Sequence, residues 1–93
     1  MDDGSTDSST EVALRCSQCY SGKVTYLEHE CHQNRGLAAS RNVALAGARG
    51  EYIAILDADD VWLPHKLDRQ LSIMRSYPNV GMLSGCTEYW QSW

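Results

Sequence analysis

Three aspartates, Asp57, Asp59 and Asp60, follow directly after a short apolar run at residues 52–56. On an extended chain, Asp57 and Asp59 would point the same way, with their Cα atoms roughly 6–7 Å apart. Two carboxylates so placed can hold one hard divalent cation, directly or through its water shell, and the cation can hold a diphosphate. The alternative is that the acids only cap a following helix and face water.

The elements that would position these acids form a βαβ pattern. Residues 52–56 are apolar and partly β-branched, which favours a strand buried on both faces, as in a parallel sheet. Residues 24–27 predict another short strand, and residues 37–49 predict an alanine-rich helix closed by Gly50. Such a unit is expected to be parallel and right-handed. Ligands of open α/β sheets gather at the carboxyl ends of strands, which is where the acids would lie.

Two further helices and one strand complete the expected α/β class. A Ser-x-x-Glu capping box within residues 8–11 predicts a helix that runs to about Tyr20. Pro64 suits the first turn of another helix, and Pro78 would stop it. Residues 80–83 then predict a further strand.

Length and composition exclude several classes of protein. With 93 residues, the chain is one domain at most. A net charge of −4 and the lack of a basic stripe argue against binding to nucleic acid. No apolar stretch approaches a membrane span, and an acidic, polar start predicts no signal peptide. The cytosol is therefore the expected compartment.

The four cysteines allow two interpretations. Cys16-x-x-Cys19, followed by a third cysteine and two histidines, could form a zinc site. However, the fourth cysteine is distant, and no second paired-ligand motif follows. Cys16 and Cys19 also share a helical face with Val12 and Tyr20, where a reduced cysteine packs as a small hydrophobe. We therefore predict reduced thiols packed against the sheet, and no zinc.

Several conspicuous side chains have two interpretations each. Arg41 is either solvated or a donor that reaches a nucleotide or orients the carboxylates. Trp62 could stack on a base as a lid or pack beside the helix start. The aromatic residues at the end of the chain either await a partner or continuation, or fold back on the domain; they are Tyr89, Trp90 and Trp93.

Three segments, in this order and spacing, resemble the nucleotide-binding half of glycosyltransferase family 2, which are inverting enzymes with a GT-A-type fold. They are Asp-Asp-Gly-Ser-Thr-Asp at residues 2–7, Asn-Arg-Gly-Leu-Ala-Ala-Ser-Arg-Asn at residues 34–42, and residues 50–60 with Trp62 and Pro64 behind them. The resemblance covers residues 1–71. It implies a partial three-layer sandwich with a mostly parallel sheet, as in nucleotide-diphospho-sugar transferases.

The resemblance also implies a role for each matching residue. Asp3 would contact the uracil or equivalent base, with Asp2 beside it. Asp59 would be a direct ligand of Mg²⁺ or Mn²⁺, and Asp57 would face the ribose or a metal-bound water. Arg41 matches a polar position close to this site. The implied substrates are a nucleoside-diphosphate sugar and an acceptor that these residues do not identify.

The departures from the family pattern predict an incomplete domain. The family begins with a strand, a helix and a second strand, and Met1 stands where that second strand should end. The family's catalytic base and acceptor region would follow Trp93. We therefore expect residues 1–93 to be a partial nucleotide-sugar-binding domain without a catalytic residue, in the cytoplasm or at the cytoplasmic face of a membrane. The alternative is a noncatalytic remnant that binds metal and nucleotide and needs a partner chain to cover an exposed sheet edge.

Overall fold

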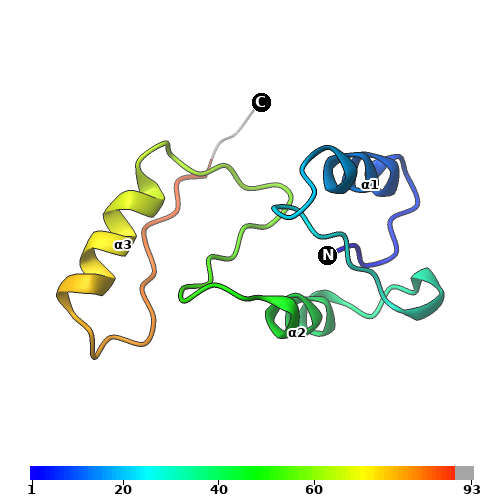
Figure 1. Ribbon diagram of the computed structural model, residues 1–93. Helices are drawn as coiled ribbons and strands as arrows, with labels where there is room; N and C mark the ends of the chain where they lie inside the picture. The colour runs from blue at the N-terminus through cyan, green and yellow to red at the C-terminus, as the bar shows by residue number, and fades with distance from the viewer. Residues whose placement is uncertain (90–93) are drawn as a thin grey trace. The chain divides into compact units, whose positions relative to one another are not determined.

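The computed structural model describes residues 1–89 and divides the chain into two compact units, Met1–Ala54 and Ile55–Trp93. The first contains helix α1 (Ser9–Cys19), the short 3₁₀ helix η1 (Glu30–His32) and helix α2 (Leu37–Gly47). The second contains helix α3 (Lys66–Ser76), as Figure 1 shows. No helix of residues 1–89 is long and apolar enough to cross a membrane.

The helices lie close to where the sequence pattern predicts them. Helix α1 starts within the expected segment, but its capping box does not form, because Ser8 makes no side-chain hydrogen bond as N-cap. Asp7 accepts the Ser9 N–H at 2.9 Å instead. Helix α2 ends two residues earlier than expected, since Ala48 is already extended. Helix α3 begins after the turn at Pro64 and ends before Pro78.

The predicted sheet does not form among residues 1–89. The segments 24–27, 52–56 and 80–83 are not strands, and the one β-bridge outside named strands joins Asp2 and Glu28 in parallel. A strand needs neighbours that pair with its backbone N–H and C=O groups, and a strand buried on both faces also needs layers that cover it. The described residues supply neither. The expected βαβ unit and three-layer sandwich are therefore not confirmed here.

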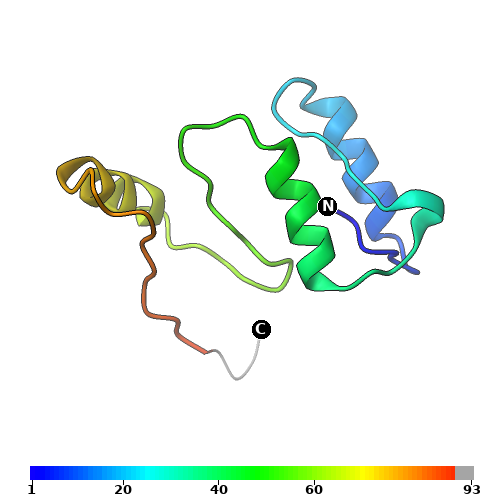
Figure 2. The same ribbon diagram turned by 90° about the horizontal axis from the view of Figure 1, so that it is seen from below.

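The first unit is assembled around its N-terminal segment. The Asp2 N–H donates to the Leu27 carbonyl at 2.8 Å, which ties the start of the chain to the segment before η1. Both views show this start between α1 and α2 (Figures 1 and 2). The buried residues of the described chain are all polar, and none is hydrophobic: they are Asp2, His29 and Ser40, each at most 8% exposed. Polar contacts therefore define the interior of this unit.

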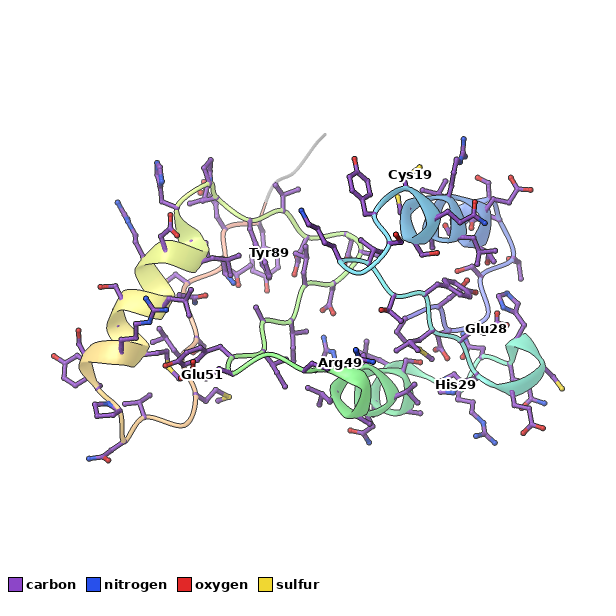
Figure 3. The ribbon with its side chains drawn as sticks, viewed as in Figure 1. Cys19, Glu28, His29, Arg49, Glu51 and Tyr89 are labelled. Carbon is purple, nitrogen blue, oxygen red and sulfur yellow. The ribbon has the colours of Figure 1, made fainter. Side chains whose placement is uncertain are left out.

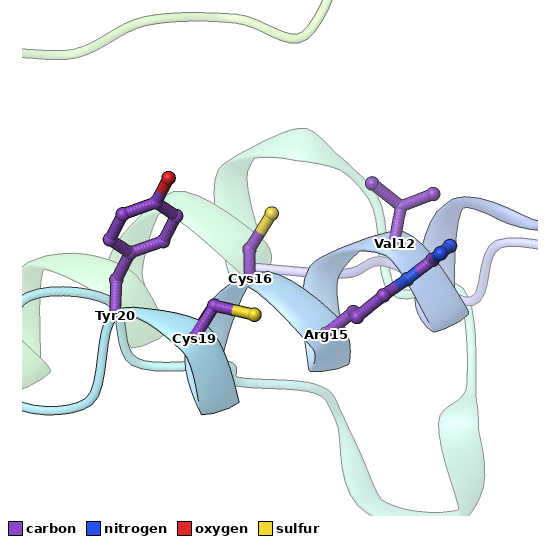
Figure 4. A pocket seen from close by; sticks show the side chains of 5 residues that line it. All are labelled: Val12, Arg15, Cys16, Cys19 and Tyr20. Atoms are coloured by element: carbon purple, nitrogen blue, oxygen red, sulfur yellow. The ribbon is translucent and has the colours of Figure 1, made fainter.

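The cysteine prediction is wrong on packing. Cys16 and Cys19 are free thiols, as predicted, but both are exposed. They line a pocket on the α1 face that they share with Val12 and Tyr20 (Figure 4). The helical spacing of these residues was predictable, but the sheet that would cover their face is not formed among residues 1–89.

Arg41, Trp62 and Tyr89, which had two interpretations each, differ in their exposure. Arg41 is half-buried on α2. Trp62 is half-buried, and Lys66 Nζ lies 4.3 Å from its ring centroid, a cation–π contact beside the helix start. Tyr89 is 89% exposed. Trp90 and Trp93 lie outside the described residues.

Candidate functional site

The Asp-Asp-Gly-Ser segment forms a tight turn. The Ser5 N–H donates to Asp2 Oδ1 at 2.9 Å, the side-chain-to-backbone bond that aspartate makes readily in turns. Gly4 has φ +77°, a conformation that suits glycine. A Cβ at Gly4 would lie 2.8 Å from the Asn34 nitrogen and 2.9 Å from the His32 oxygen. The turn therefore lies directly against the backbone that leads from η1 to α2.

Asp2 is buried within the unit and accepts three hydrogen bonds there. Its carboxylate accepts hydrogen bonds from the Ser5 N–H, from the Thr10 hydroxyl at 2.6 Å and from the Tyr26 hydroxyl at 3.1 Å. These donors, Thr10 foremost, hold the pKa of Asp2 far below its ordinary value. Asp2 is therefore an ionised carboxylate that joins the turn to α1 and to the segment before η1.

Asp3 points to the start of α2. Its two carboxylate oxygens accept the Arg35 N–H at 2.7 Å and the Gly36 N–H at 2.9 Å. These bonds, with the Arg35 N–H as the largest cause, lower the pKa of Asp3. The position is electrostatically favourable, because the N-terminus of a helix attracts negative charge. The side chain remains 25% exposed, so the carboxylate keeps an edge open to solvent.

A buried hydrogen bond lies beneath Asp3. His29 Nε2 is 2.9 Å from Ser40 Oγ and 3.5 Å from Asp3 Oδ1. A serine–histidine–aspartate relay uses the two different ring nitrogens of the histidine, whereas here one nitrogen faces both partners. The group therefore ties the turn to α2 and is not arranged to activate a serine nucleophile.

A second network lies on the other side of the turn. His32 Nε2 is 2.9 Å from the Ser5 carbonyl oxygen, and His32 Nδ1 is 2.8 Å from Glu28 Oε2. The Tyr26 hydroxyl lies 2.8 Å from the same Glu28 oxygen. The pKa of Tyr26 is raised to about 12, mainly by burial and then by the neighbouring carboxylates of Glu28 and Asp2. Glu28 and His29, both labelled in Figure 3, stand on the stretch between α1 and η1.

Sequence reasoning missed most of this network. The sequence pattern indicated the histidines only as possible zinc ligands, and it indicated no functional role for Tyr26 or Ser40. The contact between Ser5 and His32 spans 27 positions along the chain, so it depends on tertiary structure and not on local spacing. The available signal was chemical: two adjacent carboxylates near the interior require donors, and histidine and tyrosine are suitable donors.

The second acidic segment lies in the other unit and forms a turn. The Asp60 N–H donates to the Asp57 carbonyl at 3.1 Å, with residues 58–59 in the turn. The extended geometry predicted for Asp57 and Asp59 is therefore wrong, because aspartate at the first position of a β-turn favours this local structure. Asp57 is half-buried and Asp59 is exposed. The proximity of Asp3 and Asp59 stays a prediction.

The described residues contain no cluster of three or more His, Cys, Asp or Glu side chains arranged to hold a metal ion. Two carboxylates nevertheless fit a magnesium-type ion, which binds proteins through one or two carboxylates and takes its other ligands from water and phosphate. Asp59 is exposed at the turn. The donor set at Asp57 and Asp59 is therefore compatible with Mg²⁺ or Mn²⁺.

Comparison with known proteins gives consistent results. The sequence profile described as "Glycosyl transferase family 2" matches residues 1–89. An uncharacterized glycosyltransferase of Nostoc sp. is 37% identical over 83 residues, which cover 89% of this chain and 25% of the relative. A succinoglycan biosynthesis protein of Rhizobium meliloti is 43% identical over 72 residues, covering 77% of this chain and 20% of the relative.

An enzyme of Escherichia coli is also similar, at 38% identity over 68 residues, which cover 73% of this chain and 26% of the relative. It is named UDP-Glc:alpha-D-GlcNAc-diphosphoundecaprenol beta-1,3-glucosyltransferase. The chain thus spans between a fifth and about a quarter of the length of these three relatives. No solved structure matches it significantly.

Proposed function

The chain belongs to glycosyltransferase family 2, and we propose that it supplies the donor-binding part of an enzyme that transfers a sugar from a nucleoside diphosphate to an acceptor. The observation that carries the proposal is the family match over residues 1–89, which includes both acidic segments. Family membership implies the α/β fold of nucleotide-sugar transferases. In that fold, residues 52–56 would be a strand, and Asp57 would follow at its carboxyl end.

We assign Asp3 to the nucleotide base. Each oxygen of a carboxylate has two acceptor sites, and each Asp3 oxygen accepts one backbone N–H within the unit. The exposed edge can therefore accept an N–H from a base such as uracil while the carboxylate stays fixed. Asp2 is buried and holds three internal hydrogen bonds, so its part is to fix the turn that presents Asp3.

We assign Asp57 and Asp59 to the diphosphate end of the donor. Asp59 would ligate Mg²⁺ or Mn²⁺ directly, and Asp57 would face the ribose or a metal-bound water. When bound, the ion neutralises charge on the departing nucleoside diphosphate. Arg41, half-buried on α2, is a candidate donor to the nucleotide. Support for these roles comes from the motif positions and from the carboxylate chemistry of the turn.

A noncatalytic module that binds metal and nucleotide is the second candidate. It is favoured by the exposure of Asp68 and Glu88, the acids that follow Asp60. A general base must lie within hydrogen-bond reach of the acceptor hydroxyl, usually in a shaped site. Neither exposed acid lies in such a site. We therefore propose that residues 1–93 bind a donor nucleotide without turning it over.

Titration calorimetry with uridine diphosphate tests the proposal; the name of the Escherichia coli relative, which specifies UDP-glucose, suggests this nucleotide. We expect weak binding that requires Mn²⁺, because Asp57 and Asp59 otherwise repel the diphosphate. Asp59→Asn should abolish the metal dependence, whereas the control Asp68→Asn, an exposed acid of the same unit, should retain it. Equal binding without Mn²⁺ would contradict the metal assignment. Robust donor consumption by residues 1–93 would contradict the expected lack of turnover.

A further inference from the structure

The two ring nitrogens of His32 both face acceptors. Nε2 is 2.9 Å from the Ser5 carbonyl oxygen, and Nδ1 is 2.8 Å from Glu28 Oε2. A backbone carbonyl and an ionised carboxylate only accept hydrogen bonds, whereas neutral imidazole carries a single N–H. Both contacts form together only when both nitrogens carry hydrogen. The observed geometry is therefore that of the positively charged imidazolium.

The charges around His32 support this protonation state. The Tyr26 hydroxyl has one hydrogen but lies near two carboxylates, Glu28 at 2.8 Å and Asp2 at 3.1 Å. His32 is the one titratable cation in this hydrogen-bonded network, where the negative charges of Asp2 and Glu28 both favour its charged form. The Ser5 carbonyl contributes most to a raised pKa of His32, Glu28 follows, and burial opposes them. Glu28 in turn has a lowered pKa because His32 donates to it.

The position of His32 links it mechanically to the turn. Its ring contacts the carbonyl of Ser5, and its own carbonyl oxygen lies within 2.9 Å of the Cβ position at Gly4. Cys31 and His32 both have positive φ, at 56° and 55°. Residues other than glycine keep such conformations only where surrounding contacts hold them. The two ring hydrogen bonds are contacts of this kind, so η1 and the turn hold each other in place.

We propose that His32 is a charged positioning residue: its imidazolium clamps the Asp-Asp-Gly-Ser turn against η1 and so fixes Asp3 for the nucleotide. Loss of one ring proton leaves a single N–H, so the ring no longer holds both the Ser5 carbonyl of the turn and the Glu28 carboxylate, and the turn loosens. The clamp is complete below the ordinary histidine pKa of 6.5 and is lost as pH rises through the higher pKa of the folded unit. The consequence for nucleotide binding rests on the proposed function of Asp3, whereas the clamp itself does not.

Nitrogen-15 NMR of residues 1–93, without nucleotide, tests the clamp directly. His32 ring nitrogens and the Gly4 and Ser5 amides are followed from about pH 5 to about pH 9. We expect the ring to lose its proton with a midpoint above that of the same histidine in urea. The two amides should shift with that midpoint. A midpoint no higher than that in urea, or amides that do not shift with the titration, would overturn the proposal.

Variants separate the clamp from a general effect of charge. Glu28→Gln should shift the His32 midpoint downward, because the ring loses its ionised partner. His32→Gln should abolish the pH-dependent shift of the Gly4 and Ser5 amides. The matched control His65→Gln makes the same chemical change at an exposed residue of the other unit and should preserve that shift. If His32→Gln prevents folding, the titration of the wild type still tests whether the His32 ring proton and the turn are linked.

Nucleotide binding provides the second readout. Uridine diphosphate with Mn²⁺ is titrated at one pH below and one above the His32 midpoint, in the wild type and in His32→Gln. Comparison at each pH cancels the titration of the nucleotide itself. We expect the wild type to lose affinity at the higher pH relative to the variant, and an equal ratio at both pH values would refute the link to binding. Absence of any binding would count against the proposed function, while the NMR titration would still test the clamp.

Discussion

Replacing Gly4 with alanine should open the turn that presents Asp3. Gly4 has φ +77°, and an added Cβ would lie 2.8 Å from the Asn34 nitrogen and 2.9 Å from the His32 oxygen. Both obstacles are backbone atoms, which cannot rotate away as the end of a side chain can. The substitution therefore adds a steric clash to the ordinary strain of a left-handed alanine.

The size of the effect follows from these two parts. A left-handed conformation costs a residue other than glycine about 1–2 kcal/mol. Forcing a methyl group into a closely packed site costs about 1–3 kcal/mol. Gly4→Ala should therefore lower the free energy of opening of the turn by about 2–5 kcal/mol. Gly22→Ala is the matched control, because Gly22 has φ +83° but nothing within 4 Å of the added carbon.

Hydrogen exchange at the Asp2 and Ser5 amides measures this opening, since those groups donate to the Leu27 carbonyl and to Asp2 Oδ1. Gly22→Ala should lower protection by at most the cost of a left-handed alanine. Protection in the two variants should then differ by about 5- to 150-fold, which corresponds to about 1–3 kcal/mol. Equal loss of protection in Gly4→Ala and Gly22→Ala would refute the close approach of the turn to η1.

Thr10→Val removes the hydroxyl that donates to Asp2, so the pKa of that carboxyl should rise toward its ordinary value of 3.8, as an NMR titration can measure. The depressed pKa of Asp2 stabilises the folded unit above pH 3.8, and this contribution is lost on acidification. The stability of Thr10→Val should therefore fall less on acidification than that of the wild type. The control Thr10→Ser keeps the hydroxyl and should behave as the wild type. Cys16 and Cys19 are free and exposed, so both should react with a thiol reagent in the folded chain as fast as in urea. Strong protection of either thiol would contradict their exposure.

The helices were predictable because their signals are local. The helical spacing of apolar residues, the alanine-rich composition of α2 and the Pro78 stop of α3 act within a turn or two of the residues that they organise. Even so, the exact cap of α1 was not predictable. Asp7 and Ser8 both offer an oxygen to the same helix start, and the free energies of such caps differ by little.

The residues of the acidic site could be predicted from the sequence, but their arrangement in space could not. The family resemblance pointed to Asp2 and Asp3, but which carboxylate faces inward depends on Thr10 and Tyr26, which donate to Asp2 from other segments of the unit. Likewise, local turn chemistry at Asp57 prevails over the extended form that was predicted for it. An extended segment is stable only when neighbouring strands bind its backbone, so its shape cannot be derived from its own residues alone.

The exposure of residues 52–56 bears on where this segment belongs in the family fold. Ile53 and Ile55 are 54% exposed, and Leu56 is 49% exposed. Successive strand residues point to opposite faces, so Ile55 and Leu56 would present apolar side chains to both sides of a sheet. An edge strand with a solvated face would carry polar residues at alternate positions, and this segment has none. In the α/β fold of the family it therefore suits an interior strand covered on both faces, which would carry Asp57 to the carboxyl edge where nucleotide ligands bind.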